Sequence, residues 1–216
     1  MPRNKYPEET VRKILDASIG LFLKKGYEQT TVLDIVNNMG GLTRGAFYHH
    51  FKSKEEVLNA VAEEFFGQNN PFEYVKSLTS LSGLGKIKEM LRFSFESQFK
   101  NEHKAIANAV LSLMKDPRFL KEQVDTVPEV ARFLVPLIEE GIADGSIRKT
   151  NPKALAEFIL LQFNLWMIPT IFPCDGEEAY EKILFLKDVF ESIGCPIIDP
   201  DMLEVFASIG QNLPFE

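Results

Sequence analysis

Residues 30–54 read TTVLDIVNNMGGLTRGAFYHHFKSK and contain two short helical patterns separated by the glycine pair Gly40-Gly41. In both patterns, apolar residues recur at the spacing of one helix face and predict its buried side, namely Val32, Ile35, Val36, Phe47 and Phe51. Two short helices joined by a tight turn form a helix-turn-helix, whose second helix enters the major groove of DNA. The stretch therefore predicts a helical DNA-binding unit.

Helix start signals lie inside this stretch and at its end. Thr30 or Thr31 can cap the first short helix, and Asp34 follows three residues after Thr31 as an acidic residue of the first turn. Ser53 with Glu56 three residues later has the pattern of a capping box. Thr43 stands where the second short helix begins. These signals set the expected starts of three helices.

Two longer helices flank the short pair. An apolar stripe over residues 7–25 predicts an amphipathic helix that stops at Gly26. The helix that opens at Ser53 extends to about residue 68, and the sequence Asn69-Asn70-Pro71 then predicts a break, beyond which a helix can resume. We place the domain boundary within this fourth helix, because the composition changes there from basic to acidic.

The second short helix carries groups that suit DNA recognition. Arg44 can form a bidentate contact with guanine O6 and N7, and Thr43 can contact a base edge or a thymine methyl group. Gly45 leaves the start of the helix nearly bare, which allows its backbone to approach a duplex closely. The residues that can donate to phosphate oxygens, or that stand at a helix start with free backbone N–H groups, are Thr31, Tyr48, His49, Lys52, Ser53 and Lys54.

Plainer roles exist for some of these residues. Arg44 can be a solvated charge, and Tyr48 can be a packing residue with a free hydroxyl. The neighbours His49 and His50 do not predict a metal site, because adjacent helical residues point about 100° apart.

The order of these motifs resembles the DNA-binding domain of the TetR family of repressors. The matching motifs, within residues 8–61, are GY-x-x-T-T, V-x-D-I, a glycine turn, T-R-G-A-F-Y-H-H-F and S-K-E-E-V-L. The resemblance implies that residues 43–49 are the recognition helix, with Thr43, Arg44 and Gly45 nearest the bases. It implies phosphate contacts by Thr31, Tyr48, His49 and Lys54.

The chain departs from the family pattern in the turn. The sequence Met39-Gly40-Gly41-Leu42 has one glycine more than the family usually has between its second and third helices. We expect an altered turn, which weakens a base-by-base transfer of contacts from the family to this chain.

The charge of the chain is unevenly distributed. Residues 1–54 hold nine Lys and Arg against five Asp and Glu, a net charge of +4, so the total of −7 leaves −11 for residues 55–216. A basic head on an acidic body is typical of a protein whose head binds nucleic acid. A solvated lysine-rich helix would give the same count.

The sequence also limits the cellular location. No apolar run approaches the roughly 18 residues that span a bilayer, and no hydrophobic stretch follows the basic N-terminal residues. We therefore expect a cytoplasmic protein without a membrane partner, in which Cys174 and Cys195 are reduced thiols.

The rest of the chain is helical in pattern as well. Helices are expected over residues 83–100, 103–115, 117–143 with interruptions at Pro128 and Pro136, 152–167, 176–194 and 200–211. No alternating run is long enough to predict a strand. The predicted fold is all-α, with a three-helix helix-turn-helix domain at residues 1–65 and a larger helical ligand-sensing and dimerisation domain at residues 66–216.

Aromatic residues are the candidates for a ligand site in this second domain. Helical bundles bind apolar ligands between their helices, in pockets that aromatic side chains line. The residues that we associate with an apolar or aromatic small-molecule effector are Phe93, Phe99, Phe133, Phe163 and Trp166. Core packing is the alternative role for each of them, and Trp166 can belong to a pocket or to an interface.

The segment FLVPLIEEGIADGSIR, residues 133–148, and the NPKALAEF that follows resemble the sensor half of the same family. By that resemblance, the helices near 152–169 and 176–194 pair across a two-fold axis as a homodimer interface. Both segments are apolar over more than one face, and such helices need a covering partner.

Together these features predict a ligand-responsive transcriptional repressor that binds double-stranded operator DNA and is released by a small molecule. No catalytic residue, metal site or cofactor is expected, because the sequence has no nucleophile with a nearby base, no Gly-rich phosphate loop and no H-E-x-x-H motif. Three alternatives remain: an activator of the same family, a helical interaction protein that does not bind DNA, and a helical enzyme with a hydrophobic substrate.

Overall fold

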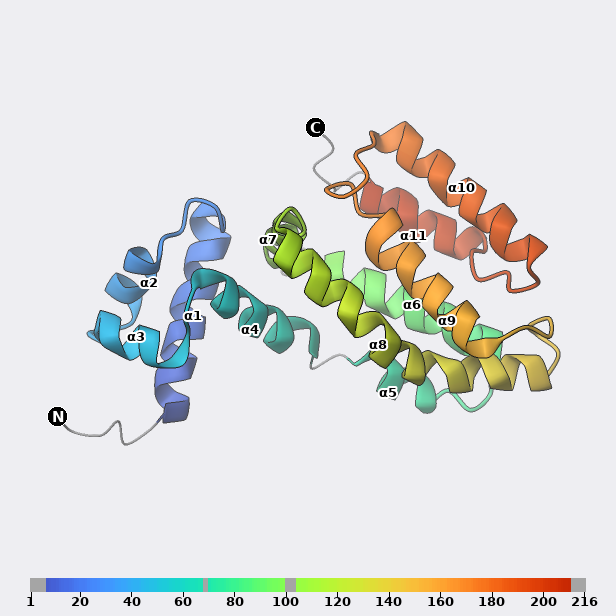
Figure 1. Cartoon of the computed structure of the whole chain (residues 1–216), viewed down its shortest axis with the longest axis horizontal. Helices are drawn as coiled ribbons and strands as arrows, with labels where there is room; N and C mark the ends of the chain where they lie inside the picture. The colour runs from blue at the N-terminus through green and yellow to red at the C-terminus, as the bar shows by residue number, and fades with distance from the viewer. Residues whose placement is uncertain (1–6, 68–69, 100–103, 211–216) are drawn as a thin grey trace. The chain divides into compact units, whose positions relative to one another are not determined.

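The computed structural model describes residues 7–67, 70–99 and 104–210, which are helical with short connections (Figure 1). These residues belong to two compact units. The first unit is formed by Met1–Gln68 and Lys100–Leu113, and the second by Asn69–Phe99 and Met114–Glu216. The predicted all-α class is confirmed.

The first unit is a small helical bundle. Its helices are α1 (Pro7–Lys25), α2 (Val32–Asn38), α3 (Arg44–His50), α4 (Lys54–Gly67) and α7 (Lys104–Leu113). The three N-terminal helices contact one another, and α7 packs on α1 and α4 although the sequence analysis groups it with the second domain. Fully buried side chains of the bundle include Ile14, Phe22, Ile35, Phe47, Val57 and Ile106.

Local signals account for the helix starts in this unit. Of the two candidate caps, Thr31 is the one used, and it forms a capping box with Asp34 at the start of α2. The hydroxyl of Thr43 accepts a hydrogen bond from the backbone N–H of Ala46 at the start of α3. At α4, the hydroxyl of Ser53 accepts from the backbone N–H of Glu56 at 3.3 Å, while the Glu56 carboxylate accepts from the backbone of Lys52. The second half of this cap is thus one residue displaced from a regular capping box.

The second unit contains the remaining helices. These are α5 (Pro71–Lys76), α6 (Gly83–Phe99), α8 (Pro117–Ala143), α9 (Pro152–Leu161), the π-helical turn η1 (Gln162–Trp166), α10 (Gly176–Ser192) and α11 (Pro200–Gly210). The long α8 packs on α6 and α9. Its buried residues recur at three- and four-residue steps, the spacing of one helix face, and are Val127, Ala131, Leu134, Leu137, Ile138 and Gly141.

The expected interruption of α8 does not occur. The helix continues through Pro128 and Pro136, and both prolines are exposed. A proline inside a helix removes one backbone hydrogen bond and leaves a carbonyl without its partner. On the solvent side of α8, water can hydrate the released carbonyls, and the buried side keeps its packing.

The apolar helix expected over 152–167 ends differently from the prediction. It is α-helical to Leu161 and then widens into η1, in which the N–H of Met167 donates to the carbonyl of Gln162 at 3.0 Å. The helix ends expected at residues 68, 100, 103 and 211 lie outside the described residues.

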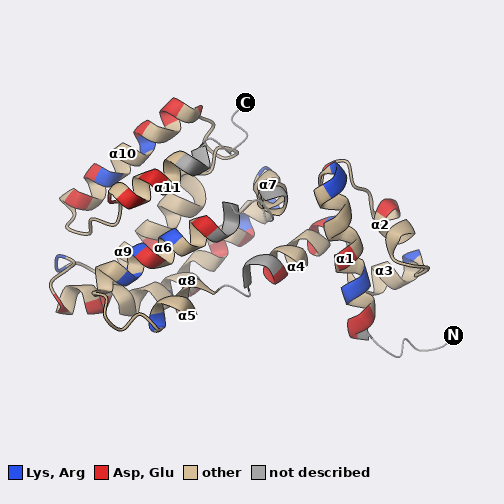
Figure 2. Cartoon of the chain, turned by 180° about the vertical axis from the view of Figure 1, so that it is seen from behind, with Lys and Arg blue, Asp and Glu red and all other residues tan. Residues whose placement is uncertain are grey.

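Acidic residues recur along α10 and α11 (Figure 2), in agreement with the acidic composition of the C-terminal part of the sequence. Within the described ranges, no helix combines the length and the apolarity that crossing a membrane requires.

Candidate DNA-binding surface and apolar groove

The outer face of α3 presents the residues that the sequence predicts to contact DNA. The side chain of Phe47 is fully buried and fixes the inner face of the helix. The exposed residues on and around the other face are Thr43, Arg44, Gly45, Tyr48, His49 and Lys52. Six of the nine residues that the sequence predicts to contact DNA are thus exposed on and around α3.

Arg44 and Tyr48 form a pair on this surface. The guanidinium carbon of Arg44 lies 5.4 Å from the centroid of the Tyr48 ring, which is a cation–π distance. Tyr48 also meets the buried Phe47 ring edge to face at 5.3 Å. The paired residues are one helical turn apart, so the tyrosine ring supports the arginine that precedes it.

The turn between α2 and α3 uses both of its glycines. Gly40 and Gly41 have φ values of 64° and 88°, in the left-handed region that favours glycine. The side chain of Met39, just before them, is buried. The additional glycine therefore serves as a second left-handed residue in the turn, and both helices keep their own start signals.

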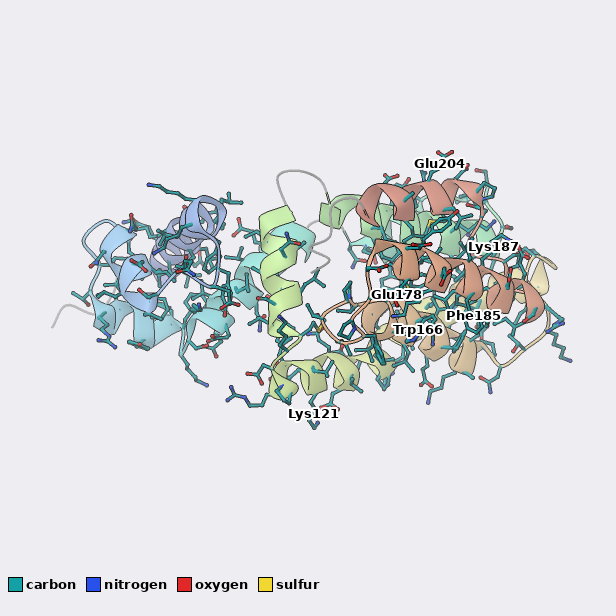
Figure 3. All side chains as sticks on the ribbon, turned by 90° about the horizontal axis from the view of Figure 1, so that it is seen from above. Lys121, Trp166, Glu178, Phe185, Lys187 and Glu204 are labelled. Atoms are coloured by element: carbon teal, nitrogen blue, oxygen red, sulfur yellow. The ribbon has the colours of Figure 1, made fainter. Side chains whose placement is uncertain are left out.

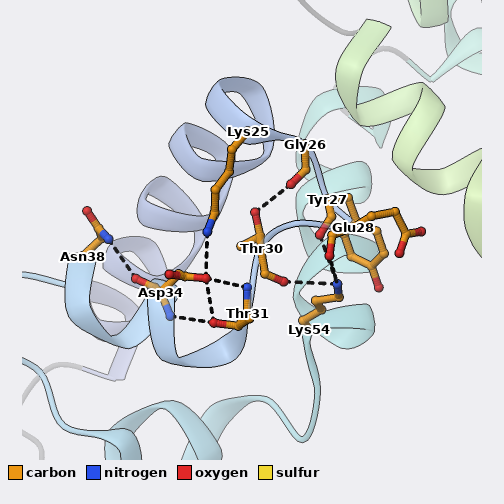
Figure 4. A network of polar contacts seen from close by, with 9 residues as sticks. All are labelled: Lys25, Gly26, Tyr27, Glu28, Thr30, Thr31, Asp34, Asn38 and Lys54. Carbon is orange, nitrogen blue, oxygen red and sulfur yellow. Dashed lines mark hydrogen bonds and ion pairs between the residues drawn. The ribbon is translucent and has the colours of Figure 1, made fainter.

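The start of α2 is held by a polar network around Asp34 (Figure 4). The carboxylate of Asp34 accepts from the backbone N–H of Thr31 at 2.8 Å and from the Thr31 hydroxyl at 2.6 Å, and it pairs with the Lys25 ammonium at 2.7 Å. These contacts, first with Lys25 and then with Thr31, hold the pKa of Asp34 well below its usual range. Thr31, which the sequence predicts to contact phosphate, is exposed, and its hydroxyl is hydrogen-bonded to Asp34.

Lys54 is engaged inside the first unit as well. Its ammonium donates to the backbone carbonyls of Tyr27 at 3.0 Å and Thr30 at 3.1 Å, and it lies 4.1 Å from the centroid of the Tyr27 ring. Nothing in the sequence around Tyr27 predicts this contact. The two residues lie 27 positions apart, and no local pattern connects them.

The aromatic residues predicted to bind an effector do not gather in one place. Phe93 stacks on Tyr74 at 4.5 Å, and Phe133 is exposed on α8 beside Phe72. Phe163 is a buried core residue between the rings of Phe190 and Phe206, to both of which it is nearly parallel. The side chain of Phe99 lies outside the described residues.

Trp166 lines an apolar groove on the second unit, of about 490 Å³. The groove lies between the α9–η1 segment and α10, and its lining residues are Phe158, Leu161, Gln162, Leu165, Trp166, Phe172, Phe185, Leu186 and Val189. Trp166 and Phe185 lie near each other in Figure 3, with their ring centroids 6.1 Å apart. The side chain of Phe185 is 60% exposed.

Lys182 contacts Trp166, one of the residues that line this groove. Its ammonium donates to the backbone carbonyl of Trp166 at 3.2 Å and lies 5.1 Å from the centroid of the Trp166 ring. The positive charge of Lys182 thus lies beside the rings of Trp166 and Phe172. Among the residues that line the groove, Gln162 is polar and the others are aliphatic or aromatic. The groove suits an apolar occupant with an aromatic or aliphatic surface.

Comparisons with known proteins show what the chain is similar to. Residues 14–61 match the family described as bacterial regulatory proteins, tetR family. The chain is 27% identical over 194 residues to the HTH-type transcriptional repressor KstR2 of Rhodococcus jostii (strain RHA1), across 85% of this chain and 91% of that protein. It is 33% identical over 144 residues to KstR2 of Mycolicibacterium smegmatis, across 63% of this chain and 66% of that protein.

The fold is similar to that of solved structures. A TetR-family transcriptional regulator from Pectobacterium atrosepticum aligns with a TM-score of 0.60 and 21% sequence identity, across 88% of this chain and 97% of that one. At this identity, the similarity concerns the fold alone.

Proposed function

Because the chain belongs to the TetR family of bacterial regulatory proteins, we propose that it is a repressor that binds double-stranded operator DNA as a homodimer and is released by a small-molecule effector. The relatives are transcriptional regulators, and this chain is a regulator and not an enzyme. The observation that carries the proposal is the exposed outer face of α3, on which Arg44 and Tyr48 are paired. Because the proposed target is bacterial operator DNA, the protein acts in the cytoplasm.

The recognition helix is α3, with Thr43, Arg44 and Gly45 facing the bases. The guanidinium of Arg44 has the fork geometry that reads guanine in the major groove. Tyr48, His49 and Lys52 follow on the same accessible surface, from which they donate to phosphate oxygens. We assign DNA binding to residues 1–65, and effector binding and dimerisation to residues 66–216.

The homodimer forms through the α9–η1 segment and α10. Large apolar side chains that a single chain leaves exposed on α10 and the loop before it support this assignment, and these are Phe172, Tyr180, Leu184 and Phe185. A second copy would cover both these residues and the groove beside Trp166. The interface is self-complementary, as a two-fold axis requires.

Release follows from a shift between two arrangements of the recognition helices. In a bound dimer, the two copies of α3 enter successive major grooves, roughly 34–36 Å apart. An effector that binds better to a different spacing lowers the operator affinity, and operator DNA lowers the effector affinity by the same factor. The aromatic content of the second unit favours an apolar or aromatic effector.

The first experiment is a mobility shift with the DNA upstream of the protein's own gene, at two salt concentrations. The wild type should give a salt-sensitive, sequence-selective shift. The double variant Arg44→Ala, Tyr48→Ala should bind at least about tenfold more weakly, because it loses a base contact and the ring that supports it. Arg132→Ala is the matched control, since Arg132 is an exposed arginine on α8 in the second unit.

Two results would contradict the proposal. If the double variant bound as well as Arg132→Ala, then α3 would not be the reading helix. If neither this DNA nor fragments selected from the whole genome gave a selective complex, the protein would be a helical interaction protein. A reporter gene fused to the bound fragment distinguishes repression from activation. Deletion of the regulator raises reporter expression if the protein is a repressor and lowers it if the protein is an activator.

A further inference from the structure

The ammonium group of Lys54, a half-buried residue, is held by backbone carbonyls of the first unit. An ammonium group has three N–H donors. In the first unit, three backbone carbonyls surround that of Lys54, those of Tyr27 at 3.0 Å, Thr30 at 3.1 Å and Glu28 at 3.5 Å (Figure 4). Its two shorter hydrogen bonds are directed at the turn between α1 and α2, and the longer contact with the carbonyl of Glu28 lies at the exposed side of the same turn.

An aromatic face completes the site of the ammonium. The Tyr27 ring lies 4.1 Å from Nζ, is only 6% exposed, and packs edge to face against Phe22 in the core. The Tyr27 hydroxyl donates to Glu55, the residue after Lys54, at 3.0 Å. If Nζ moved to a phosphate, it would leave this face and strand the carbonyl of Thr30, a residue that is 1% exposed. Buried carbonyls without a partner are costly.

The turn that Lys54 holds leads directly into the DNA-binding surface. It ends at Thr31, the first residue of the capping box of α2, and the same cap is fixed from the other side by the ion pair of Lys25 with Asp34. Two lysines of the basic head thus bind the protein itself. In contrast, Arg44 at the start of α3 and Lys52 just after its end are exposed.

We propose that Lys54 is a positioning residue of the DNA-binding surface, which sets the start of α2 through the turn and does not itself bind phosphate. The inference rests on the proposed function, because it concerns how the same surface meets DNA. It separates two groups of basic residues that charge alone cannot distinguish. Lys25 and Lys54 shape the surface, and Arg44 and Lys52 contact the duplex.

The dependence of DNA affinity on salt tests this division. Each lysine–phosphate contact contributes about 0.9 to the slope of log K against log salt concentration. Lys52→Met and Lys54→Met are compared with the wild type on one mixed-sequence 30-bp duplex, at a temperature where circular dichroism shows all three proteins fully folded. This probe requires no knowledge of the operator, because non-specific binding depends on the phosphates.

Different changes are expected in the two variants. Lys52→Met should lower the magnitude of the slope by about 0.9 per bound protomer. Lys54→Met should keep the wild-type slope and bind about tenfold more weakly at every salt concentration, because the surface is misplaced while its phosphate contacts remain. A residue that only stabilised the fold would leave the affinity of the folded protein unchanged.

The inference is overturned if Lys54→Met lowers the slope as Lys52→Met does, or if it changes neither slope nor affinity. Should Lys54→Met fail to fold, acylation of lysines in the wild type, with and without the duplex, decides the question. We expect Lys54 to react slowly in both states and Lys52 to become protected only by DNA. A Lys54 that reacts readily in the free protein and is protected by DNA would be a phosphate contact.

Failure of the underlying proposal looks different. A wild type that binds no duplex at any salt concentration would refute DNA binding. The slow acylation of Lys54 in the free protein would still report its contacts with the turn.

Discussion

At the scale of single residues, His50 gives the first unit a dependence on pH. The ring is half-buried at the end of α3, and its Nε2 atom is buried without a hydrogen-bond partner among the described residues. Burial lowers the pKa of His50, and the neighbouring His49 lowers it further. Below about pH 6.5, the unfolded chain therefore takes up this proton more readily than the folded protein.

The sign of the effect follows from this difference. The contribution of His50 to the free energy of unfolding is constant above the pKa of the unfolded chain, about 6.5. It falls as the pH decreases from there towards the pKa of His50 in the folded protein. We predict that the free energy of unfolding, measured with urea, falls between about pH 7.5 and 5.5, and that His50→Gln removes part of the fall.

His49→Gln is the matched control for this prediction. His49 is the adjacent, exposed histidine of the same helix. The control should keep most of the wild-type fall. Equal falls in the wild type and in His50→Gln would show that the burial of His50 does not control the response.

At the scale of helices and turns, an element can be predicted from the sequence when its start and stop signals lie close together in the chain. The bounds expected for α1 and the start expected for α2 agree with the structure, because the stop at Gly26 and the cap at Thr31 are signals between residues close in the chain. The path of α8 through Pro128 was missed, because a proline's effect depends on whether its side of the helix faces solvent. The contact of Lys54 with Tyr27 arises only after α1 and α4 pack together.

The turn before α3 yields a prediction about backbone strain. Gly41 has a φ of 88° with no atom within 4 Å of an added Cβ, so Gly41→Ala would be strained by its backbone conformation and not by crowding. We predict that Gly41→Ala lowers the free energy of unfolding by about 1–2 kcal/mol, measured by denaturant titration.

Gly20 provides the opposite case. It lies within α1, has no atom within 4 Å of an added Cβ, and its φ is not positive. Gly20→Ala should raise the free energy of unfolding by about 0.5–1 kcal/mol, because alanine favours the helix. If both substitutions had the same effect, the left-handed conformation of Gly41 would not be what the turn requires.

At the scale of the whole molecule, the proposed dimer predicts a specific role for Phe185. Its ring is 60% exposed on α10 beside the apolar groove, so the fold of one chain does not depend on burying it. Phe185→Glu places a charge in the proposed interface, where desolvation without a partner is unfavourable. We predict that it raises the dissociation constant of the dimer by at least about thirtyfold, measured by analytical ultracentrifugation.

Phe133 supplies the control, because its side chain is 59% exposed on α8, outside the proposed interface. Phe133→Glu should leave the dimer intact. A dimer that tolerated Phe185→Glu equally well would require another interface. Mobility shifts with the monomeric variant then show how far operator affinity depends on two linked recognition helices.

The effector site is the part of the function that sequence patterns locate least well. Phe163 and Trp166 are only three positions apart, yet one is in the aromatic core and the other lines the groove, because η1 turns them into different surroundings. Aromatic composition predicts that apolar surfaces exist. Which rings remain accessible depends on packing between distant helices.

The first unit is discontinuous in the chain, since α7 joins it after α5 and α6 have passed into the second unit. A fragment that stops near residue 65 would uncover the faces of α1 and α4 on which α7 packs. A chimera that joins the first unit to another sensor domain therefore needs residues 104–113 in addition to residues 7–67. A rearranged gene, in which a linker replaces α5 and α6 so that α7 directly follows α4, would encode the first unit as one uninterrupted segment.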